Sequence, residues 1–315
     1  MSHHRFRLAG VVVLVCASLA VVARVDAQTA EDGVMLSRGT LFFGDLYTHD
    51  SWDTYWEGSL ERTNGNVGTV TTQTNSLFAN YGVTNRLNVI ATFPYVWTHA
   101  SQGVLHGMQG FQDVSLTAKY NALETPFTHL GSLRVIGAVA GGLPMTNYTP
   151  DLLPLSIGSQ SKRVSGRVTV NFQSKPGWYV NGTSAYTWRG DVTLDRPYYY
   201  TNGQLFLTNK VSMPQVLTYE LSAGYMKRGL MATVAFSEQH TEGGGDIRRQ
   251  DLPFVSNRMN FSKVGASLMY PLPKLRPLAV ALGYAYTLDG RNVGKSTAVT
   301  AGVTYTLSLH GRPVQ

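Results

Sequence analysis

The stretch AVTAGVTYTLSL, residues 298–309, decides the fold because its side chains alternate strictly between two kinds. The odd-numbered positions are apolar: Val299, Ala301, Val303, Tyr305, Leu307 and Leu309. The even-numbered positions are small or weakly polar, and none carries a charge. Strict alternation predicts a β-strand with one apolar face. The uncharged opposite face leaves open which environment lies on each side of the strand.

The same alternation recurs along the chain in runs of about 9 to 12 residues. Soluble strands average about five or six residues, whereas a tilted strand that crosses a bilayer needs about 9 to 11. The pattern therefore predicts membrane-crossing strands. The expected strands are 52–60, 70–81, 86–98, 111–121, 132–142, 163–172, 178–188, 215–226, 230–239, 259–270, 277–288 and 296–308.

The composition agrees with a membrane barrel. The chain has 315 residues, of which 43% are hydrophobic and only 14% charged. Soluble domains carry about 25% charged residues. In a membrane β-barrel, half of each strand faces lipid and the other half a wet lumen, which keeps charge low. The formal net charge is +7 with no basic block, so nucleic acid is not an expected partner.

The N-terminus indicates export. A short basic start, an apolar core and small residues before Gln28 form a secretory signal peptide over residues 1–27. An uncleaved anchor is the alternative. Cys16 lies inside this segment, so the exported chain would have no cysteine and no disulfide. We expect an N-terminal segment at 28–51, a β-barrel at 52–309 and a C-terminal tail at 310–315.

The predicted connections alternate between short and long, as at 82–86 and 227–229 against 143–162 and 189–214. Short periplasmic turns and longer external loops are typical of outer-membrane barrels. The sequence thus predicts an all-β, transmembrane, antiparallel up-and-down barrel of about 12 strands in the bacterial outer membrane. Its expected partners are outer-membrane lipid, lipopolysaccharide and the barrel assembly machinery. A soluble β-sandwich or lipocalin-like barrel is the alternative, and the strand length and loop pattern weigh against it.

Two stretches carry a family resemblance: YGVTNRLNVIATFPYVW (81–97) and GFQDVSLTAKYN (110–121). They resemble the outer-membrane family called the putative meta-pathway of phenol degradation family. Those proteins are similar to long-chain fatty-acid and aromatic-hydrocarbon uptake channels. The resemblance implies a barrel for small hydrophobic or aromatic molecules and implies no catalytic residues. Many such barrels end in an aromatic residue, whereas this chain continues to HGRPVQ.

If the apolar faces point to lipid, a set of charged residues faces the lumen. Asp53 and Glu57 belong to this set through the predicted strand 52–60. The other candidate lumen-lining residues are Asp113, Lys119, Arg134, Arg167, Arg189, Glu220 and Lys263. A set that contains both acidic and basic residues suits either a hydrated passage or a network of ion pairs across the bore. A barrel of twelve strands has a bore of intermediate width, wider than that of the filled eight-stranded barrel and narrower than that of the open sixteen-stranded porin.

Residues 28–51 are apolar enough to fold into this bore, and we predict a plug or gate there. The alternatives are one or two extra strand-like pieces or a loose periplasmic tail. A second candidate site is the long external loop 196–214, whose aromatic residues can capture an aromatic or fatty ligand. The candidate substrate-binding residues are Tyr198, Tyr199, Tyr200 and Phe206. The alternative is a loop that packs on itself or against lipopolysaccharide.

Enzymatic function is not expected. The stretch DGRNVGKST (289–297) lacks one residue of the phosphate-loop spacing and precedes a strand rather than a helix. His99, His106 and His240 fall on external loops, but their spacing does not require a catalytic cluster. No cofactor and no metal site is predicted. The predicted function is passive uptake of small hydrophobic or aromatic molecules. The alternatives are a general porin for polar solutes and a structural or adhesion barrel.

Overall fold

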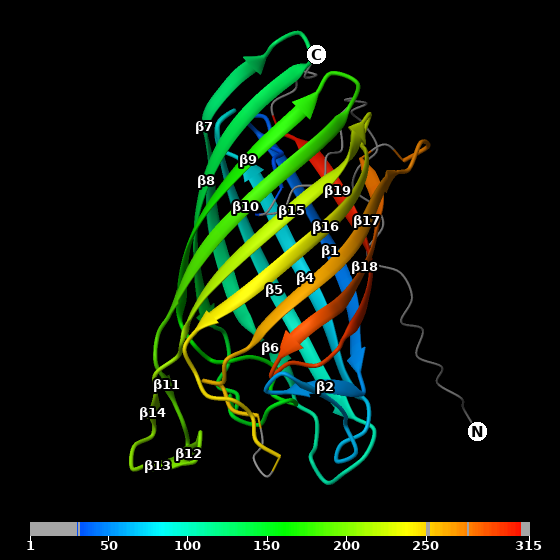
Figure 1. Ribbon diagram of the computed structural model, residues 1–315. Coiled ribbons are helices and arrows are strands. Elements are labelled where there is room, and N and C mark those ends of the chain that lie inside the picture. The colour runs from blue at the N-terminus through cyan, green and yellow to red at the C-terminus, as the bar shows by residue number, and fades with distance from the viewer. Residues whose placement is uncertain (1–29, 31, 250–252, 276, 310–315) are drawn as a thin grey trace, which may run out of the picture.

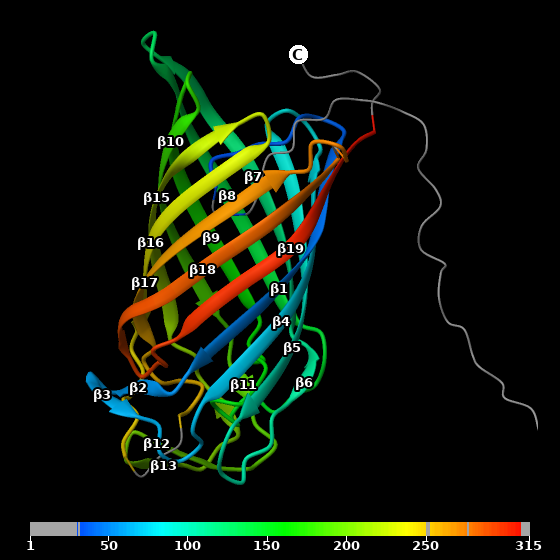
Figure 2. The same ribbon diagram turned by 90° about the vertical axis from the view of Figure 1, so that its right-hand side faces the viewer.

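The computed structural model describes residue 30 and residues 32–249, 253–275 and 277–309. The predicted signal peptide and C-terminal tail lie outside these residues. Twelve long antiparallel strands close into one barrel (Figures 1 and 2). They are β1 (Thr40–Trp52), β4 (Val70–Gly82), β5 (Leu87–Ala100), β7 (Asp113–Phe127), β8 (Gly131–Pro144), β9 (Arg163–Ser174), β10 (Trp178–Arg189), β15 (Gln215–Lys227), β16 (Leu230–Glu242), β17 (Asn260–Pro271), β18 (Leu278–Arg291) and β19 (Thr297–Ser308).

Each long strand pairs with its neighbours in the chain, and the circle closes because β1 pairs with both β4 and β19. Closure pairs the backbone groups of every long strand on both sides, as a strand surrounded by lipid requires. Eleven of the twelve predicted strands are confirmed, and their ends agree with the prediction to within three residues except at the end of β7, which extends to Phe127. No helix in the described part of the chain is long and apolar enough to cross a membrane.

Short turns and long loops lie at opposite ends of the barrel (Figure 1). The long loops contain small additional strands, all at the end where Figure 1 labels β2 and β11 to β14. These are β2 (Thr54–Glu57), β3 (Leu60–Thr63), β6 (Gln109–Phe111), β11 (Val192–Thr193), β12 (Tyr199–Thr201), β13 (Gln204–Phe206) and β14 (Lys210–Val211). The connection between the predicted strands 111–121 and 132–142 is shorter than expected, because β7 passes a bulge between Asn121 and Leu123 and continues to Phe127.

The final strand shows which face meets lipid. Val299 and Val303 are about half exposed on the outer wall, whereas Thr304 and Thr306 are buried on the inner side. The exposed residues of the other long strands are also mainly apolar, among them Leu77, Leu116 and Val168. A belt of this kind is suited to the hydrocarbon region of a bilayer. The chain is therefore an outer-membrane β-barrel.

The predicted first strand, 52–60, is wrong. The first strand of the barrel is β1, and residues 54–63 form the hairpin β2–β3 in the first long loop. Asp53 and Glu57 consequently lie at the external end rather than on the barrel wall. The sequence did not reveal β1 because its two faces are mixed. Phe42 and Leu46 line the bore, whereas Asp45 lies on the outer face beside Leu77 and Val303.

The closing seam depends on a small residue in β19. Gly302 lies opposite Leu46 of β1, and a Cβ atom at residue 302 would meet the backbone oxygen of Asp45 and the side chain of Leu46. We expect Gly302→Ala to lower the free energy of unfolding by about 1–3 kcal/mol because it overpacks this seam. Urea denaturation followed by the mobility shift of the folded barrel in gels measures this.

Gly182→Ala in β10 is the matched control, because no atom lies within 4 Å of a Cβ placed there. The two variants should therefore differ in their urea midpoints. Equal midpoints would show that the β1–β19 seam does not depend on the glycine.

Candidate functional site: the bore and its external loops

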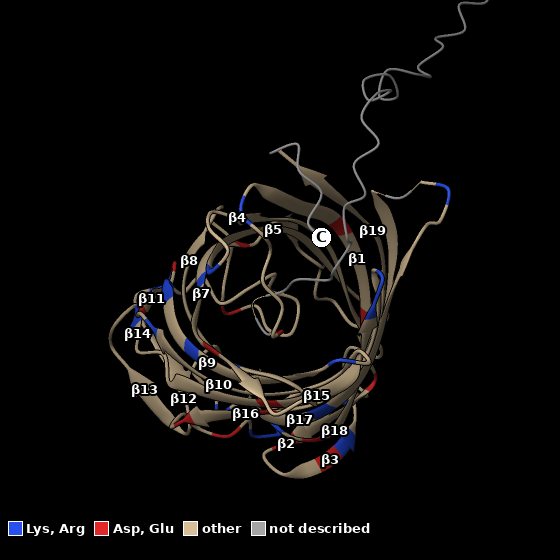
Figure 3. Cartoon of the chain, turned by 90° about the horizontal axis from the view of Figure 1, so that it is seen from above, with Lys and Arg blue, Asp and Glu red and all other residues tan. Residues whose placement is uncertain are grey.

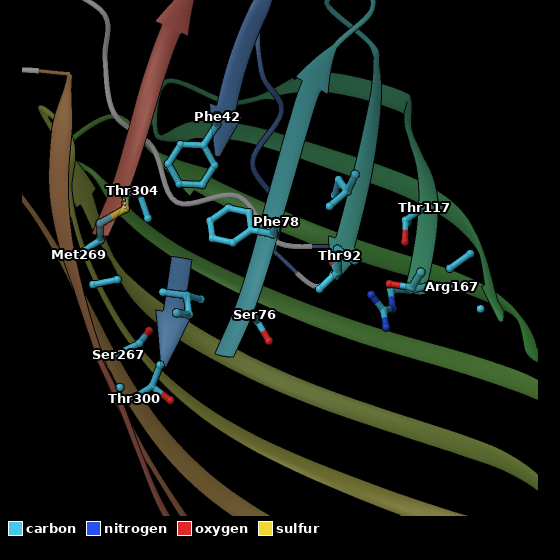
Figure 4. Close-up of a pocket in the computed structure, with 18 of the residues that line it drawn as sticks. Phe42, Ser76, Phe78, Thr92, Thr117, Arg167, Ser267, Met269, Thr300 and Thr304 are labelled. Atoms are coloured by element: carbon cyan, nitrogen blue, oxygen red, sulfur yellow. Dashed lines mark hydrogen bonds between the residues drawn. The ribbon is translucent and has the colours of Figure 1, made fainter. Parts of the chain in front are cut away.

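Seen from above, the strands enclose a central bore (Figure 3). The bore contains a cavity of about 670 Å³ (Figure 4). One side of it is apolar. Phe42 and Leu46 of β1 and Phe78 of β4 face Met231 of β16 and Met269 of β17 there. The rings of Phe42 and Phe78 are in contact, with centroids 5.4 Å apart. This volume lies within the range of about 300–1,000 Å³ that is usual for small-molecule sites.

The opposite side of the cavity is polar. Arg163 and Arg167 of β9 lie there, and Figure 4 shows the guanidinium of Arg167 across the cavity from Phe42 and Phe78. Hydroxyl side chains of β7, β9 and β10 surround the arginines. They are Ser115, Thr117, Ser165 and Thr187. The cavity therefore has an apolar wall and a polar wall, which includes two arginines, within one ligand-sized space.

The residues that precede β1 lie inside the bore. Ala30 lines the cavity, and Asp32, Val34 and Leu36 are buried. Leu36 packs in the same cluster as Phe42 and Met269. The predicted N-terminal segment, 28–51, is thus divided: residues 40–51 belong to the barrel wall as β1, and the described residues before them pack inside the short-turn end of the bore, next to the cavity.

A buried ion pair fixes this segment to the barrel wall. Lys119 of β7 has no exposed surface, and its Nζ donates to Asp32 Oδ1 at 2.8 Å and to the backbone oxygen of Val34 at 3.0 Å. Burial of an ammonium group is costly unless it is paired and hydrogen-bonded. The contact therefore couples the position of the segment to a charge on the wall.

At the external end, an aspartate joins a loop to the wall. Asp113 accepts a hydrogen bond from Tyr148 Oη at 2.7 Å and from Arg163 Nη1 at 2.9 Å. Tyr148 lies in the loop that follows β8, and its oxygen also accepts from the backbone N–H of Gln160. Burial, followed by the hydrogen bond to Asp113, raises the pKa of Tyr148 well above its usual range. The loop is therefore anchored over the mouth of the bore.

The barrel and its bore can be compared with known proteins. Residues 56–303 match the family described as "Putative MetA-pathway of phenol degradation". The chain belongs to this family. The match covers most of the barrel, so the resemblance extends well beyond 81–97 and 110–121.

The fold also matches solved structures. The COG4313 outer membrane channel from Pseudomonas putida F1 is 15% identical, with a TM-score of 0.69 that covers 90% of this chain and 100% of that one. The NanC porin is 10% identical, with a TM-score of 0.46 over 83% and 100%. A deletion mutant of the TodX monoaromatic hydrocarbon channel is 11% identical, with a TM-score of 0.44 over 87% and 91%. No curated protein matches the chain. The first likeness shows a shared fold.

The remaining predicted lumen residues lie on inner faces of the strands. Arg134 donates from Nε to Glu124 at 2.9 Å. Arg189 donates from Nε to the backbone oxygen of Pro214 at 2.6 Å. Lys263 lies over the ring of Phe261. Glu220 also points inward, and none of these four residues lines the cavity described above.

The predicted loop residues separate into two pairs. Tyr199 and Phe206 stack at 4.9 Å, and Tyr199 also stacks on Phe254 of the loop after β16. They belong to a buried cluster that includes Val192, Leu194, Val211, Met213 and Val255. Tyr198 and Tyr200 are about half exposed. The loop therefore packs partly on itself and presents two tyrosines at its surface.

Sequence reasoning missed the residues that shape the cavity from β1. Phe42 and Leu46 lie within residues 28–51, which the sequence pattern does not place in the barrel. Nothing in the sequence indicates that Asp32 pairs with Lys119. A signal was present, because Phe42, Gly44, Leu46 and Thr48 share one face of an extended strand. Among the described residues, no group of three or more His, Cys, Asp or Glu side chains could hold a metal ion.

An aspartate also organises a second external loop. Asp246 accepts hydrogen bonds from Arg291 Nε at 2.8 Å and Nη2 at 2.6 Å, and from Asn292 Nδ2 at 2.8 Å. The hydrogen bonds from Arg291 are the main reason that the pKa of Asp246 falls to about 2. These contacts join the loop after β16 to the end of β18.

We expect the buried ion pair to hold the N-terminal segment in the bore. Lys119→Met leaves Asp32 buried without its partner, which costs about 3–5 kcal/mol for a buried pair. Hydrogen exchange of residues 32–38 should therefore become much faster. The double variant Lys119→Met with Asp32→Leu should regain much of the protection, because it removes both charges. Equal protection in the wild type and the single variant would contradict this role.

We expect acid to release the loop at Asp246. A carboxylate with a lowered pKa stabilises the folded loop above its unfolded pKa of about 3.9. That contribution falls as the pH drops from about 4 and is lost as the pH passes through about 2. The protection of residues 243–249 against hydrogen exchange, taken relative to the intrinsic exchange rate at each pH, should therefore fall between pH 4 and pH 2. Asp246→Asn should lower this protection already at neutral pH and remove its pH dependence, and an unchanged profile in this variant would contradict the assignment.

Proposed function

We propose that this chain is an outer-membrane channel for the passive passage of small hydrophobic or aromatic molecules. The observation that supports this most directly is the cavity of about 670 Å³ inside the bore, with the rings of Phe42 and Phe78 on its wall. A purely structural barrel has no need of a ligand-sized internal space. The description of the family, which refers to phenol degradation, agrees with an aromatic solute.

The proposal gives the N-terminal residues the role of a gate. Ala30 forms part of the cavity surface, and the Lys119–Asp32 pair and the packing of Leu36 hold the segment in place. A solute that reaches the cavity can pass to the periplasm only when this segment moves. One buried ion pair and one apolar cluster are contacts that can break and re-form together.

Two external tyrosines are proposed as the first contact of the solute. Tyr198 and Tyr200 are exposed on the loop between β10 and β15, close to the hairpin β12–β13. Tyr199 and Phe206 then have the supporting role of holding that loop in shape through their stacked rings. Aromatic side chains on a fixed loop offer contact area with little loss of conformational freedom.

The decisive test compares the whole chain with a variant that lacks residues 28–38. This deletion leaves β1 complete, because the strand begins at Thr40. In planar bilayers we expect the whole chain to conduct little and the deletion variant to conduct at least several-fold more. Radiolabelled toluene should be taken up faster by Gram-negative cells that express the whole chain than by cells that lack it.

The alternatives predict other results. A large, steady conductance of the whole chain, unchanged by the deletion, would indicate a general porin for polar solutes. Protein that is folded but neither conducts after the deletion nor accelerates toluene uptake would indicate a structural or adhesion barrel. Tyr198→Ala with Tyr200→Ala should lower uptake without changing conductance, whereas Leu207→Ala, an exposed residue of the same loop, serves as the control.

A further inference from the structure

The short-turn end of the barrel, which faces the viewer in Figure 3, carries exposed positive charge around its rim. None of the described residues in the short turns is acidic, and Glu124 at the end of β7 is bound by Arg134. The exposed cations are Arg38 before β1, Arg86 after β4, Lys175 after β9, Lys227 and Arg228 at the end of β15, and Lys274 after β17.

The long loops at the other end differ, because many of their charges are paired within the protein. Examples are the ion pairs Arg62–Glu57, Arg196–Asp151, Arg291–Asp246 and Lys295–Glu61. The charge at the short-turn end has no such compensation on the turns themselves. An anion from outside the chain can therefore supply it.

Two of the basic turns are joined. The backbone N–H of Met226 donates to the backbone oxygen of Gly177 at 2.7 Å, which ties the turn after β15 to the turn after β9. Lys175, Lys227 and Arg228 thus lie on two adjacent turns, and all three side chains are exposed. Within the described part of the chain, no carboxylate is in ion-pair contact with them. We call these three residues the turn cluster.

Arg228 occupies a backbone position that does not favour arginine. It and Gly229 are the central residues of a two-residue hairpin turn, since Lys227 pairs with Leu230. Their φ angles are 53° and 84°, and asparagine or glycine adopts this left-handed region at lower cost. Turn geometry alone would not select a guanidinium at residue 228. The side chain therefore points to a role outside the turn.

An aromatic pair marks the bilayer boundary beside the turn cluster. Trp178 of β10 lies opposite Tyr225 of β15, and their ring centroids are 5.1 Å apart in a T-shaped contact. Trp178 is 63% exposed on the outer wall that meets lipid. Tryptophan and tyrosine are enriched at the level of the lipid headgroups. The cations of the adjacent turns consequently lie within reach of headgroup phosphates, because lysine and arginine have long flexible stems.

We propose that the turn cluster binds the phosphate of an anionic phospholipid in the periplasmic leaflet, with the upper acyl chain against Trp178. Paired N–H donors of a guanidinium match two phosphate oxygens, and the lysines add charge. Trp178 favours a lipid over an acidic protein, because its outward face is covered by the bilayer and not by a partner below the barrel. The site is independent of the proposed channel function.

The net charge of the lipid should decide how tightly it binds. Phosphatidylglycerol and phosphatidylcholine share the phosphate, but the choline group brings its own positive charge next to the turn cluster. Each lysine or arginine near a membrane surface strengthens attraction to anionic lipid about fivefold. Phosphatidylglycerol should therefore be preferred at this site.

The test offers equal amounts of dioleoyl phosphatidylglycerol and dioleoyl phosphatidylcholine to the exported chain in detergent. Native mass spectrometry measures the first lipid retained. We expect a preference of at least about fivefold for phosphatidylglycerol, which Arg228→Asn lowers about fivefold while it keeps the left-handed turn. Lys227→Gln together with Arg228→Asn should remove the preference. Arg86→Gln, which removes one cation from another turn at the same end, is the matched control and should retain it.

Three results would overturn the site. They are equal retention of the two lipids by the wild type, an unchanged preference in the double variant, and an equal loss in Arg86→Gln. Because asparagine suits the turn and the wild-type preference is measured first, a misfolded variant cannot decide the outcome.

Two further measurements identify the source of the anion. Trp178→Leu should lower retention of both lipids alike and leave the preference for phosphatidylglycerol, since the ring contacts the chain and not the charge. Glycerol phosphate and polyglutamate should not displace phosphatidylglycerol at equal charge concentration. Displacement by glycerol phosphate would assign the turn cluster to free phosphate esters, and displacement by polyglutamate would assign it to an acidic protein. Either result would overturn the lipid site.

Discussion

Closure of the sheet is the constraint on which the rest of this structure depends. A strand in lipid must pair both of its edges, and the pairing of β1 with β4 and β19 provides the last edge. Closure also gives the sheet an outer face that meets lipid and an inner face that meets the bore, an arrangement that a soluble sheet would not have. Apolar side chains such as Val299 and Leu116 then face outward, and the polar residues of the same strands can only face the bore. The inverted distribution of polar and apolar groups follows directly from the closed sheet.

Charges on the inner face must therefore be paired or hydrated within a narrow space. Lys119 is fully buried and paired with Asp32, and Asp113 is buried between Arg163 and Tyr148. Each of these aspartates joins the barrel wall to a segment outside the sheet: Asp32 through Lys119 at one end of the cavity, and Asp113 through Tyr148 at the other. Because such pairs contribute little net stability and lose much when one partner is removed, they act mainly to position those segments. The polar interior thus determines how the ends of the bore are arranged.

Sequence alone was sufficient for the fold and insufficient for the site. Eleven strands were predictable because lipid imposes one apolar face on each, which is visible as alternation in residues 298–309. The first strand was missed because Phe42 and Leu46 turn inward, where they pack in the bore, and Asp45 takes an outward position. The charged residues that face inward could be predicted from their odd or even position along each strand, because successive side chains point to opposite faces. Their partners could not, because the pairing of Lys119 with Asp32 depends on how the N-terminal residues fold back into the barrel.

The N-terminal segment and the polar wall of the cavity are linked through one strand, β7. Lys119 lies two residues beyond Thr117 on the inner face of β7, and Thr117 lines the cavity beside Arg167. While Asp32 occupies Lys119, that ammonium group is neutralised and shielded from the bore. Movement of the N-terminal segment would separate Asp32 from Lys119 and expose an ammonium group on the inner face of β7. The position of the segment and the charge on this part of the inner wall are therefore coupled, because neither can change without the other.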